Sequence, residues 1–337
     1  IMANKCYDNF VLENKIEDML ITQLDMNAYI TPDYSLTEAP GMVKKVNTYT
    51  GLGNVEDLAM GEGNTQDIGV DYSTKEYRVG VTQGRFPYYD EQEMTDPMVV
   101  ETGLKKLAEN MTNDLTTKAI TEFGNATILS PITAWSFDDF VDAIAKYPYE
   151  NEDGLFCLVN PAQKAAIRKQ LGDTLQYSEG FARTGYIGTV CGVPVIISKA
   201  VPEGIAFLAT KDAVKVFVKK GVEVEQTRDA DHRKTTVFAR KVMLVALTDA
   251  TRVVKMGKEQ ATAATITTAT ANNKTVSGAA TTGATVEVYI NGVLDGTATA
   301  AANAYTYTAK NNLATSDVVK VVARVEGFLE SIATKTV

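Results

Sequence analysis

The sequence is poor in the residues that most often carry enzyme chemistry. It has one histidine, His232, and three widely spaced cysteines, Cys6, Cys157 and Cys191, among 337 residues. An odd number of scattered cysteines argues against a disulfide framework or a zinc site and is typical of free thiols in a reducing compartment. The motifs GxSxG, GxGxxG and GxxxxGKS/T are absent, and no pair among the many carboxylates stands out as an acid and a base. We therefore expect no catalytic residues, no cofactor and no enzyme activity.

The only candidate metal ligands are Asp229, Asp231 and His232, in the stretch QTRDADHRKTT. A site with two carboxylates and one imidazole needs further ligands that converge on the metal, and the sequence identifies none. The same residues are typical of a polar hairpin tip with mixed charges. We therefore predict no metal site at this position.

Long apolar segments and an excess of positive charge are also missing. No apolar run approaches the roughly 18 residues of a membrane span. The first residues, IMANKCYDNF, lack the pattern of a signal peptide. The net charge of −9 argues against nonspecific binding of nucleic acid by the whole surface. We therefore expect a protein that is made in the cytoplasm and has no membrane partner.

A glycine cluster in GYIGTVCGVPVIISKAVPEG, residues 185–204, raises the question of a phosphate site. Phosphate loops place their glycines between a strand and a helix whose N-terminus holds the anion. Here Gly185, Gly188 and Gly192 precede a short strand, Val193 to Ile197. We therefore predict a tight loop that enters a β-rich subdomain.

Two segments near the N-terminus predict a long β-hairpin that follows an N-terminal arm with a short amphipathic helix. VKKVNTYTG can pair with VDYSTKEYRVGVTQG, in which alternation places Tyr77, Val79 and Val81 on one face. The connecting LGNVEDLAMGEGNTQDIG is acidic and rich in glycine. Because a two-stranded hairpin cannot bury both faces by itself, it must lie on another surface, such as a neighbouring subunit.

A long helix is the clearest local prediction. It covers residues 96–123, with Asp96 as N-cap, Pro97 at the first helical position and Gly124 at its end. Its apolar residues recur at helical spacing: Leu104, Leu107, Met111, Leu115 and Ala119.

Residues 136–259 predict an α+β arrangement. Ser136 starts a capped helix, LFCLV at 155–159 is a buried strand, and a second helix runs from Asn160-Pro161 to Leu171-Gly172. AVKVFVKKGVEVEQT predicts a hairpin-like pair of alternating strands. TTVFARKVMLVALTDATRVVKM predicts one or two long strands.

The composition changes near Gly257, and the remaining residues predict an all-β domain. Residues 260–337 hold five basic and five acidic residues, so residues 1–259 carry the whole net charge. Asn291-Gly292 in VEVYINGVLDGTATA is a strong hairpin signal. Alternating segments at intervals of about 8–12 residues predict a small sandwich.

The order of arm, glycine-tipped hairpin, long helix, α+β subdomain and returning strands resembles the major capsid proteins of tailed bacteriophages, which have the HK97-like fold. The stretches that carry the resemblance are EYRVGVTQGRFPYYDEQEMTDPMVVETGLKKLAENMTNDLTTKAITEF and TGYIGTVCGVPVIISKAVPEGIAFLATKDAVKVFVKK, and it covers about residues 1–258. It implies an N-terminal arm over 1–42, an extended loop and return strand over 43–90, the spine helix of a peripheral domain over 91–129, a mainly axial domain over 130–235, and peripheral strands over 236–257.

The resemblance implies a virion shell protein that self-assembles into hexamers and pentamers and encloses double-stranded DNA. Charged residues of the loop and its surroundings would contact other subunits: Lys44, Lys45, Glu56, Asp57, Glu62, Asp67, Lys75, Arg78 and Arg85. Some family members join subunits covalently through a lysine of this loop. No lysine lies between Val46 and Thr74, so we expect no such crosslink. The short arm after Met2 implies a separate scaffolding protein, unless a longer segment has been cleaved. The resemblance also implies a portal protein and a possible decoration protein as partners.

The last domain, residues 258–337, resembles bacterial immunoglobulin-like domains through V-x-G, V-x-V-Y-x-N-G, a tyrosine-bearing strand and EGFLES. Such domains on phage coats usually face outward, and binding of host-surface carbohydrate is a role often proposed for them. A domain that only stabilises the shell is the alternative. For the whole chain, the alternatives are a non-viral encapsulin-type shell protein, which is not expected to carry this domain, and a bacterial surface adhesin, which the missing signal peptide argues against.

Overall fold

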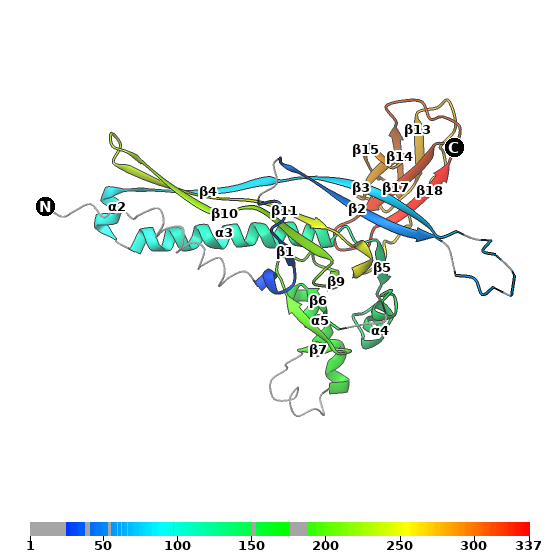
Figure 1. The fold of residues 1–337 in the computed structure, drawn as a ribbon, viewed down its shortest axis with the longest axis horizontal. Coiled ribbons are helices and arrows are strands. Elements are labelled where there is room, and N and C mark those ends of the chain that lie inside the picture. The colour runs from blue at the N-terminus through cyan, green and yellow to red at the C-terminus, as the bar shows by residue number, and fades with distance from the viewer. Residues whose placement is uncertain are drawn as a thin grey trace. The chain divides into compact units, whose positions relative to one another are not determined.

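Figure 1 shows the computed structural model of the chain. It describes residues 25–37, 41–52, 55–58, 60–61, 63–65, 67–96, 98–149, 153–175 and 188–337. The helix predicted in the N-terminal arm, Pro97 and Gly185 lie outside these residues. The chain divides into two compact units, one within residues 1–125 and 211–250 and the other within residues 126–210 and 251–337.

A four-stranded sheet and one long helix form the first unit. The strand order is β1-β10-β11-β4, with β1 parallel to β10 and the other pairs antiparallel. The helix α3 packs along β4, β10 and β11 (Figure 1). The bounds of the elements are η1 Asp25–Ala28, β1 Thr31–Asp33, β4 Gly80–Tyr89, α2 Asp90–Thr95, α3 Met98–Phe123, β10 Val214–Asp229 and β11 Lys234–Leu247.

The sequence pattern of α3 explains its burial along one side. Its 26 residues extend for about 40 Å. The Asp96 carboxylate accepts the Met98 N–H at 2.9 Å, and the Gly124 N–H donates to the Ile120 carbonyl at 2.9 Å, so both predicted ends are confirmed. Although α3 is long, no helix in the described part of the chain is long and apolar enough to cross a membrane. The predicted apolar residues are all buried: Leu104, Leu107, Met111, Leu115 and Ala119.

The strand β10 corrects one prediction. AVKVFVKKGVEVEQT does not form a hairpin-like pair, because all of it after Ala213 falls within one 16-residue strand that pairs with β11. The register shifts between Val218 and Lys220 and again between Lys220 and Glu223, so Gly221 lies in an irregular stretch that does not end the strand. Such bulges bend a long strand, and the alternation on either side of one looks like two strands in sequence.

The position of β10 also moves a predicted boundary. Residues 211–235 were expected to lie mainly with residues 130–210. Instead, β10 is hydrogen-bonded between β1 and β11 in the sheet of the first unit. The strands predicted for residues 236–257 do not stay together either, because residues 253–257 belong to the sheet of the second unit, so the divisions between the units fall near residues 125, 210 and 250.

The predicted long hairpin is confirmed as a two-stranded ribbon. β2, Val43–Leu52, pairs with β3, Gly69–Arg78, in unbroken antiparallel register. At Val79 the chain leaves this ribbon and enters β4, which pairs with β11. Val79 is buried in a cluster against which Tyr77 packs, as predicted, but Val81 is 58% exposed, so the prediction that Val81 shares this face is wrong. Alternation predicts one face only while the strand stays in one sheet.

The second unit contains a six-stranded mixed sheet with the order β5-β12-β9-β6-β8-β7. Its hydrophobic core includes Trp135, Phe140 and Ile167. The bounds are β5 Ile128–Pro131, α4 Phe137–Ala145, β6 Leu155–Val159, α5 Pro161–Leu175, β7 Thr189–Val190, β8 Val193–Ile197, β9 Ile205–Thr210 and β12 Val253–Gly257, which follows the short turn η2 Ala250–Arg252.

Both helices of this unit begin where the sequence predicts. Ser136 caps α4: its hydroxyl accepts the Asp139 N–H, and the Asp139 carboxylate accepts the Ser136 N–H at 2.8 Å. α5 begins at Pro161 but runs to Leu175, so its predicted end at Gly172 is wrong. A single glycine inside a helix costs only about 1 kcal/mol relative to alanine and need not end it.

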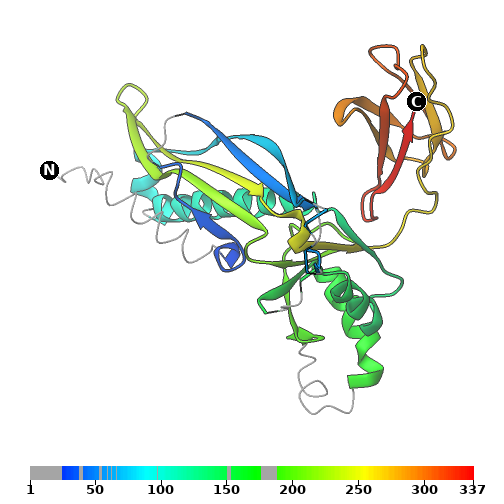
Figure 2. The same cartoon turned by 45° about the vertical axis from the view of Figure 1, so that its right-hand side comes forward.

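Residues 258–337 form an all-β region within the second unit, as the alternation predicts (Figure 2). Buried residues from both of its sheets, including Val276 and Val286, form one core. Asn291 and Gly292 have φ values of 51° and 81°, as in a type I′ turn, which confirms the predicted hairpin. One sheet pairs β13 Thr275–Ala279 with β16 Ala304–Thr308, and the other has the order β15-β14-β17-β18, with β14 Thr285–Ile290, β15 Val293–Thr299, β17 Val318–Arg324 and β18 Ser331–Thr336.

Candidate assembly surfaces

The candidate metal ligands form a turn that satisfies its own polar groups. His232 Nδ1 lies 2.8 Å from Asp229 Oδ2, and Asp229 Oδ1 accepts the backbone N–H groups of Asp231 and His232 at 3.1 and 3.3 Å. These bonds, chiefly the one to the His232 side chain, lower the pKa of Asp229. Asp231 takes part only through its backbone. Among the residues that the structure describes, no group of three or more His, Cys, Asp or Glu side chains could hold a metal ion.

The glycines near residue 190 shape a turn. The Gly188 carbonyl accepts the Val195 N–H at 2.9 Å. Cys191 and Gly192 have φ values of 51° and 81° between the antiparallel strands β7 and β8. Glycine adopts positive φ without steric cost, so the tight β7–β8 hairpin accounts for Gly192.

The β2–β3 ribbon exposes apolar side chains. Val43, Val70 and Tyr72 on its strands are 46%, 62% and 70% exposed, and Val55 and Met60 in the connection are almost completely exposed. Large exposed apolar surfaces are uncommon in monomeric soluble proteins and mark sites of contact with a partner. Within the part of the chain that the structure describes, each strand of the ribbon pairs only with the other, so both edges of the ribbon are open there. These features make the ribbon the first candidate assembly surface.

The predicted contact residues Lys44 and Lys45 make interactions within the chain. Lys45 Nζ forms a 2.7 Å ion pair with Glu76, its register partner on β3. Lys44 Nζ lies 3.1 Å from the Ser35 hydroxyl and 5.0 Å from the centre of the Phe217 ring, which connects the ribbon to β10. Lys44 therefore connects the ribbon to the rest of the first unit, whereas Lys45 joins the two strands of the ribbon.

The other predicted contact residues are spread along the ribbon and β4. Glu56 accepts the Thr65 N–H at 2.8 Å, a bond that joins the two halves of the connection between the strands. Lys75 Nζ lies 5.0 Å from the centre of the Tyr77 ring. The structure does not gather these residues into one cluster, and Glu62 lies outside the described residues. The remaining ones are exposed: Asp57, Asp67, Arg78 and Arg85.

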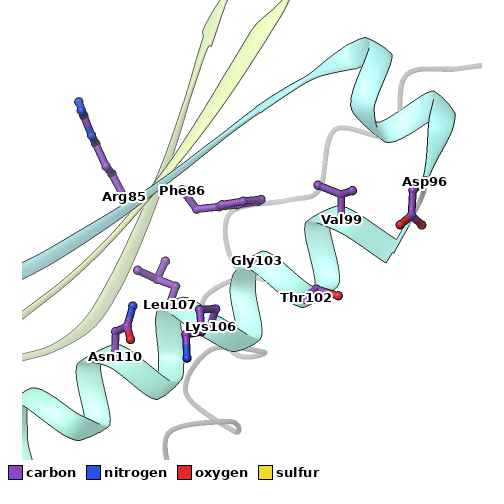
Figure 3. Close-up of a pocket in the computed structure, with 9 residues that line it drawn as sticks. All are labelled: Arg85, Phe86, Asp96, Val99, Thr102, Gly103, Lys106, Leu107 and Asn110. Atoms are coloured by element: carbon purple, nitrogen blue, oxygen red, sulfur yellow. The ribbon is translucent and has the colours of Figure 1, made fainter.

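A groove between β4 and the first half of α3 is a second candidate surface (Figure 3). Its volume is about 460 Å³. The Phe86 ring lies so close to Gly103 that an added Cβ would overlap it, and Gly84 meets Leu107 in the same way. Of the residues that line this groove, only Arg85 was predicted from the sequence as a contact residue. A glycine inside a helix and another inside a strand nevertheless both signal a close approach of the backbone to another group. The groove is lined by Arg85, Phe86, Asp96, Val99, Thr102, Gly103, Lys106, Leu107 and Asn110.

A buried ion pair joins the C-terminal β region to the sheet of the second unit, and sequence reasoning missed it. Lys255 Nζ on β12 lies 3.2 Å from the Glu330 carboxylate, and the two side chains are only 7% and 9% exposed. Arg324 on β17 donates to the same carboxylate at 2.7 Å. The Gln260 amide donates to two backbone carbonyls of the C-terminal region at 2.7 and 2.8 Å. The one available signal was a lysine inside the apolar run VVKM.

Comparison with known proteins identifies relatives of the chain. The sequence profile of a family described as phage capsid protein matches residues 72–256. The major capsid protein of Staphylococcus phage phiMR11 is 25% identical over 120 residues, which are 34% of this chain and 44% of that protein, so the chain spans less than half of this relative. A structure from Mycobacterium phage Che8 has a TM-score of 0.54 at 16% identity and covers 68% of this chain and 89% of that one. A structure of the major capsid and decoration proteins of phage G has a TM-score of 0.51 at 9% identity, with 70% and 90% covered.

The structural likeness shows the fold, which is the HK97-like capsid fold with α3 as its long spine helix. The family match begins in β3 and ends in β12, and it leaves out residues 258–337. It covers more than half of the 337 residues. The chain therefore belongs to the phage capsid protein family and is a structural protein of the virion capsid, not an enzyme.

Proposed function

We propose that this chain assembles with copies of itself into the icosahedral shell that encloses the double-stranded DNA of a tailed phage. Its membership of the phage capsid protein family supports a shell-forming role. The observation that carries the proposal is the β2–β3 ribbon, whose exposed apolar residues and two open edges require a second surface. A neighbouring copy in a hexamer or pentamer supplies that surface.

Many weak contacts hold the shell together in this arrangement. Each copy places its ribbon on one neighbour and its N-terminal arm, residues 1–42, along another. Because every copy engages several neighbours at once, the contacts reinforce one another as in multivalent binding. Residues 91–125 serve as the peripheral-domain spine, residues 126–210 as the axial domain, and residues 211–250 as returning peripheral strands.

The C-terminal region, residues 258–337, is an immunoglobulin-like domain on the outer surface of the shell in this proposal. Two β-sheets around one core and the Asn291-Gly292 hairpin support that architecture. The position of this region outside the family match suggests an addition to the shell-forming part. On the outer surface it would reach host-surface carbohydrate.

The partners follow from the same role. The net charge of −9 suits a shell that encloses DNA without holding it tightly, since strong binding to phosphates requires many cations. A separate scaffolding protein, a portal and a decoration protein complete the set. The decoration protein has a counterpart in the structure from phage G, which contains decoration proteins with the major capsid proteins.

Two other functions have weaker support. An encapsulin-type shell protein would share the fold, but the matched family is that of phage capsid proteins. A bacterial surface adhesin would leave the exposed ribbon and the spine helix unexplained.

Negative-stain electron microscopy of the full chain tests the proposal. The wild-type protein, with its scaffolding protein supplied, should form closed angular shells. A variant in which a short Gly-Ser linker replaces residues 51–69 should keep its helical circular dichroism but stop at small oligomers. Small oligomers from the wild type would contradict the shell itself, and normal shells from the variant would contradict the role of the ribbon.

The orientation of the C-terminal region needs its own measurement. A hexahistidine tag after Val337 can be labelled with nickel-coated gold on intact shells. Gold on the outside of intact shells is expected. Gold that binds only after the shells are broken open would place the region inside.

A further inference from the structure

The C-terminal β region contains a small pocket that shell assembly does not explain. Its volume is about 200 Å³, and it lies between the β14–β15 turn and the loop that joins β16 to β17. It is lined by Ile290, Val293, Asp295, Asn311, Asn312, Leu313 and Asp317.

A β-bulge sets the position of Asp295. On the pair β14–β15, Gly296 lies opposite Val288 and Leu294 lies opposite Tyr289, so Asp295 is an extra residue with no partner across the sheet. A bulge changes the direction of a side chain relative to simple alternation, and bulges are over-represented next to functional sites. The bulge therefore explains how Asp295 comes to line the pocket.

Further contacts hold the Asp295 carboxylate in place. Its Oδ2 accepts the Tyr307 hydroxyl at 2.9 Å and the Lys310 N–H at 3.0 Å. Gly296 makes room for the tyrosine, because an added Cβ would overlap the Tyr307 hydroxyl. Burial and the bond to Asp295 raise the pKa of Tyr307, which keeps it a hydrogen-bond donor. Oδ1 of Asp295 has no hydrogen bond in the described part of the chain and is available to a ligand.

The second carboxylate is fixed in a similar way. The Ala314 N–H donates to Asp317 Oδ2 at 2.7 Å, and the Asn291 amide donates to Oδ1 at 2.8 Å. These two bonds, the backbone one first, lower the pKa of Asp317 and keep it charged. The side-chain amides of Asn311 and Asn312 are exposed and have no hydrogen bond within the described residues. The pocket thus combines two oriented carboxylates with two free amides.

This lining matches the chemistry of a neutral sugar. Carboxylates accept hydrogen bonds from hydroxyl groups, and amides both donate and accept them. Ile290, which is partly exposed, and Val293, which is exposed, provide apolar surface for the C–H face of a ring. The two carboxylates would repel an anionic sugar. A bare cation would gain nothing from the apolar wall, and no third His, Cys, Asp or Glu side chain joins the two carboxylates among the described residues.

We propose that this pocket binds one neutral sugar ring of a host-surface glycan. The inference rests on the proposed outward display of the C-terminal region and names the residues that would recognise the glycan. Asp295 and Asp317 select against negative charge, and the amides of Asn311 and Asn312 bond the ring hydroxyl groups.

Saturation-transfer difference NMR on the full chain tests the site with defined probes. These are the methyl glycosides of glucose, galactose, mannose and N-acetylglucosamine, with N-acetylneuraminic acid as the anionic comparison and Ca²⁺ as the competing cation. At least one neutral glycoside should receive saturation, and the anionic sugar should receive none. The double variant Asn311→Ala/Asn312→Ala removes only exposed amides and should weaken binding by about tenfold or more.

Two further variants sharpen the test. Asp295→Asn keeps the shape of the side chain and removes its charge, so it should weaken binding of the neutral sugar and relax the exclusion of the anionic one. Thr306→Ala, an exposed change on the neighbouring strand β16 outside the pocket, should leave binding unchanged.

The outcomes separate this proposal from the proposed function. The proposal would be overturned if no neutral probe received saturation, or if the wild type and the Asn311/Asn312 variant bound equally well. It would also be overturned if Ca²⁺ bound at Asp295, as shown by its loss in Asp295→Asn, without displacing the sugar, because the sugar would then lie elsewhere. The measurement does not require assembled shells. A wild-type chain that binds sugar but forms no shells would support the pocket and refute the shell.

Discussion

Removal of the Glu330 carboxylate should destabilise the second unit of the fold. In the structure this group receives Lys255 Nζ at 3.2 Å and Arg324 at 2.7 Å. Without it, Arg324 keeps Glu287 as a partner at 3.3 Å and is 41% exposed to water. Lys255 has a side chain that is 7% exposed, and among the described residues Glu330 is its ion-pair partner, so the variant leaves this buried lysine unpaired. The cost of Glu330→Ala is therefore chiefly the cost of an unpaired buried lysine.

The size of this effect follows from the burial. Removal of one partner from a buried ion pair costs about 3–5 kcal/mol. The groove lined by Lys255 and Glu330 has a volume of about 460 Å³ and can admit water to the lysine, so we expect the lower end of that range, about 3 kcal/mol. For a unit of this size, about 1 kcal/mol corresponds to a shift of roughly 2–4 °C in melting temperature. Glu330→Ala should therefore melt about 6–12 °C below the wild type.

Differential scanning calorimetry of the unassembled full chain measures this shift. The double variant Lys255→Met/Glu330→Leu removes both charges and should recover most of the loss, because apolar residues of similar volume often replace a buried pair without cost. Glu109→Ala is the matched control, since its pair with Lys106 at 3.1 Å is exposed and should contribute less than about 1 kcal/mol. A Glu330→Ala melting curve that overlays the wild type would refute the reasoning.

Three further changes test other parts of the fold. Burial alone would raise the pKa of Asp139, but hydrogen bonds from Ser136, Thr133 and Ala134 outweigh burial and lower it. The ionised Asp139 carboxylate therefore stabilises the folded state fully above the unfolded pKa of about 3.9, and this stabilisation is lost as the pH falls through the lower folded pKa. The difference in melting temperature between wild type and Asp139→Asn should accordingly be largest at neutral pH and should shrink in acid. A difference that does not change with pH would contradict this. Gly103→Leu should overlap the Phe86 ring and speed hydrogen exchange in β4, whereas unchanged exchange would mean that the ring moves aside freely. Gly278→Ala places a Cβ on the Thr265 carbonyl, so the C-terminal region should melt earlier in near-ultraviolet circular dichroism, and an unchanged transition would show that the backbone shifts.

Sequence patterns predicted those helices and strands in which buried apolar residues recur at one regular spacing. α3 keeps one apolar face over 26 residues, and its capping residue and terminal glycine are local signals. The patterns failed where the environment changes within an element. At Val79 the chain passes from one sheet to another, and at Gly221 a bulged strand continues, and neither event alters the local alternation enough to be seen.

The candidate surfaces were less predictable because they depend on contacts between distant residues. Composition placed charges on the ribbon, but only the strand register shows that Lys45 faces Glu76. The pairing of Lys255 with Glu330 joins residues 75 positions apart. The pocket near Asp295 requires a bulge that no motif announced.

The contacts of Lys255 also change how the C-terminal region should be studied. The composition shift at Gly257 suggests an independent domain on a linker, which could be removed without consequence. In the structure, however, Gly204 lies so close to Gly327 that an added Cβ would overlap its carbonyl, and Leu329 is buried beside Gly257. Truncation after Gly257 would uncover this apolar contact and remove the partner of Lys255. A loss of shells after truncation would therefore report on the stability of the shell-forming part, and only point substitutions within the pocket can report on what the C-terminal region binds.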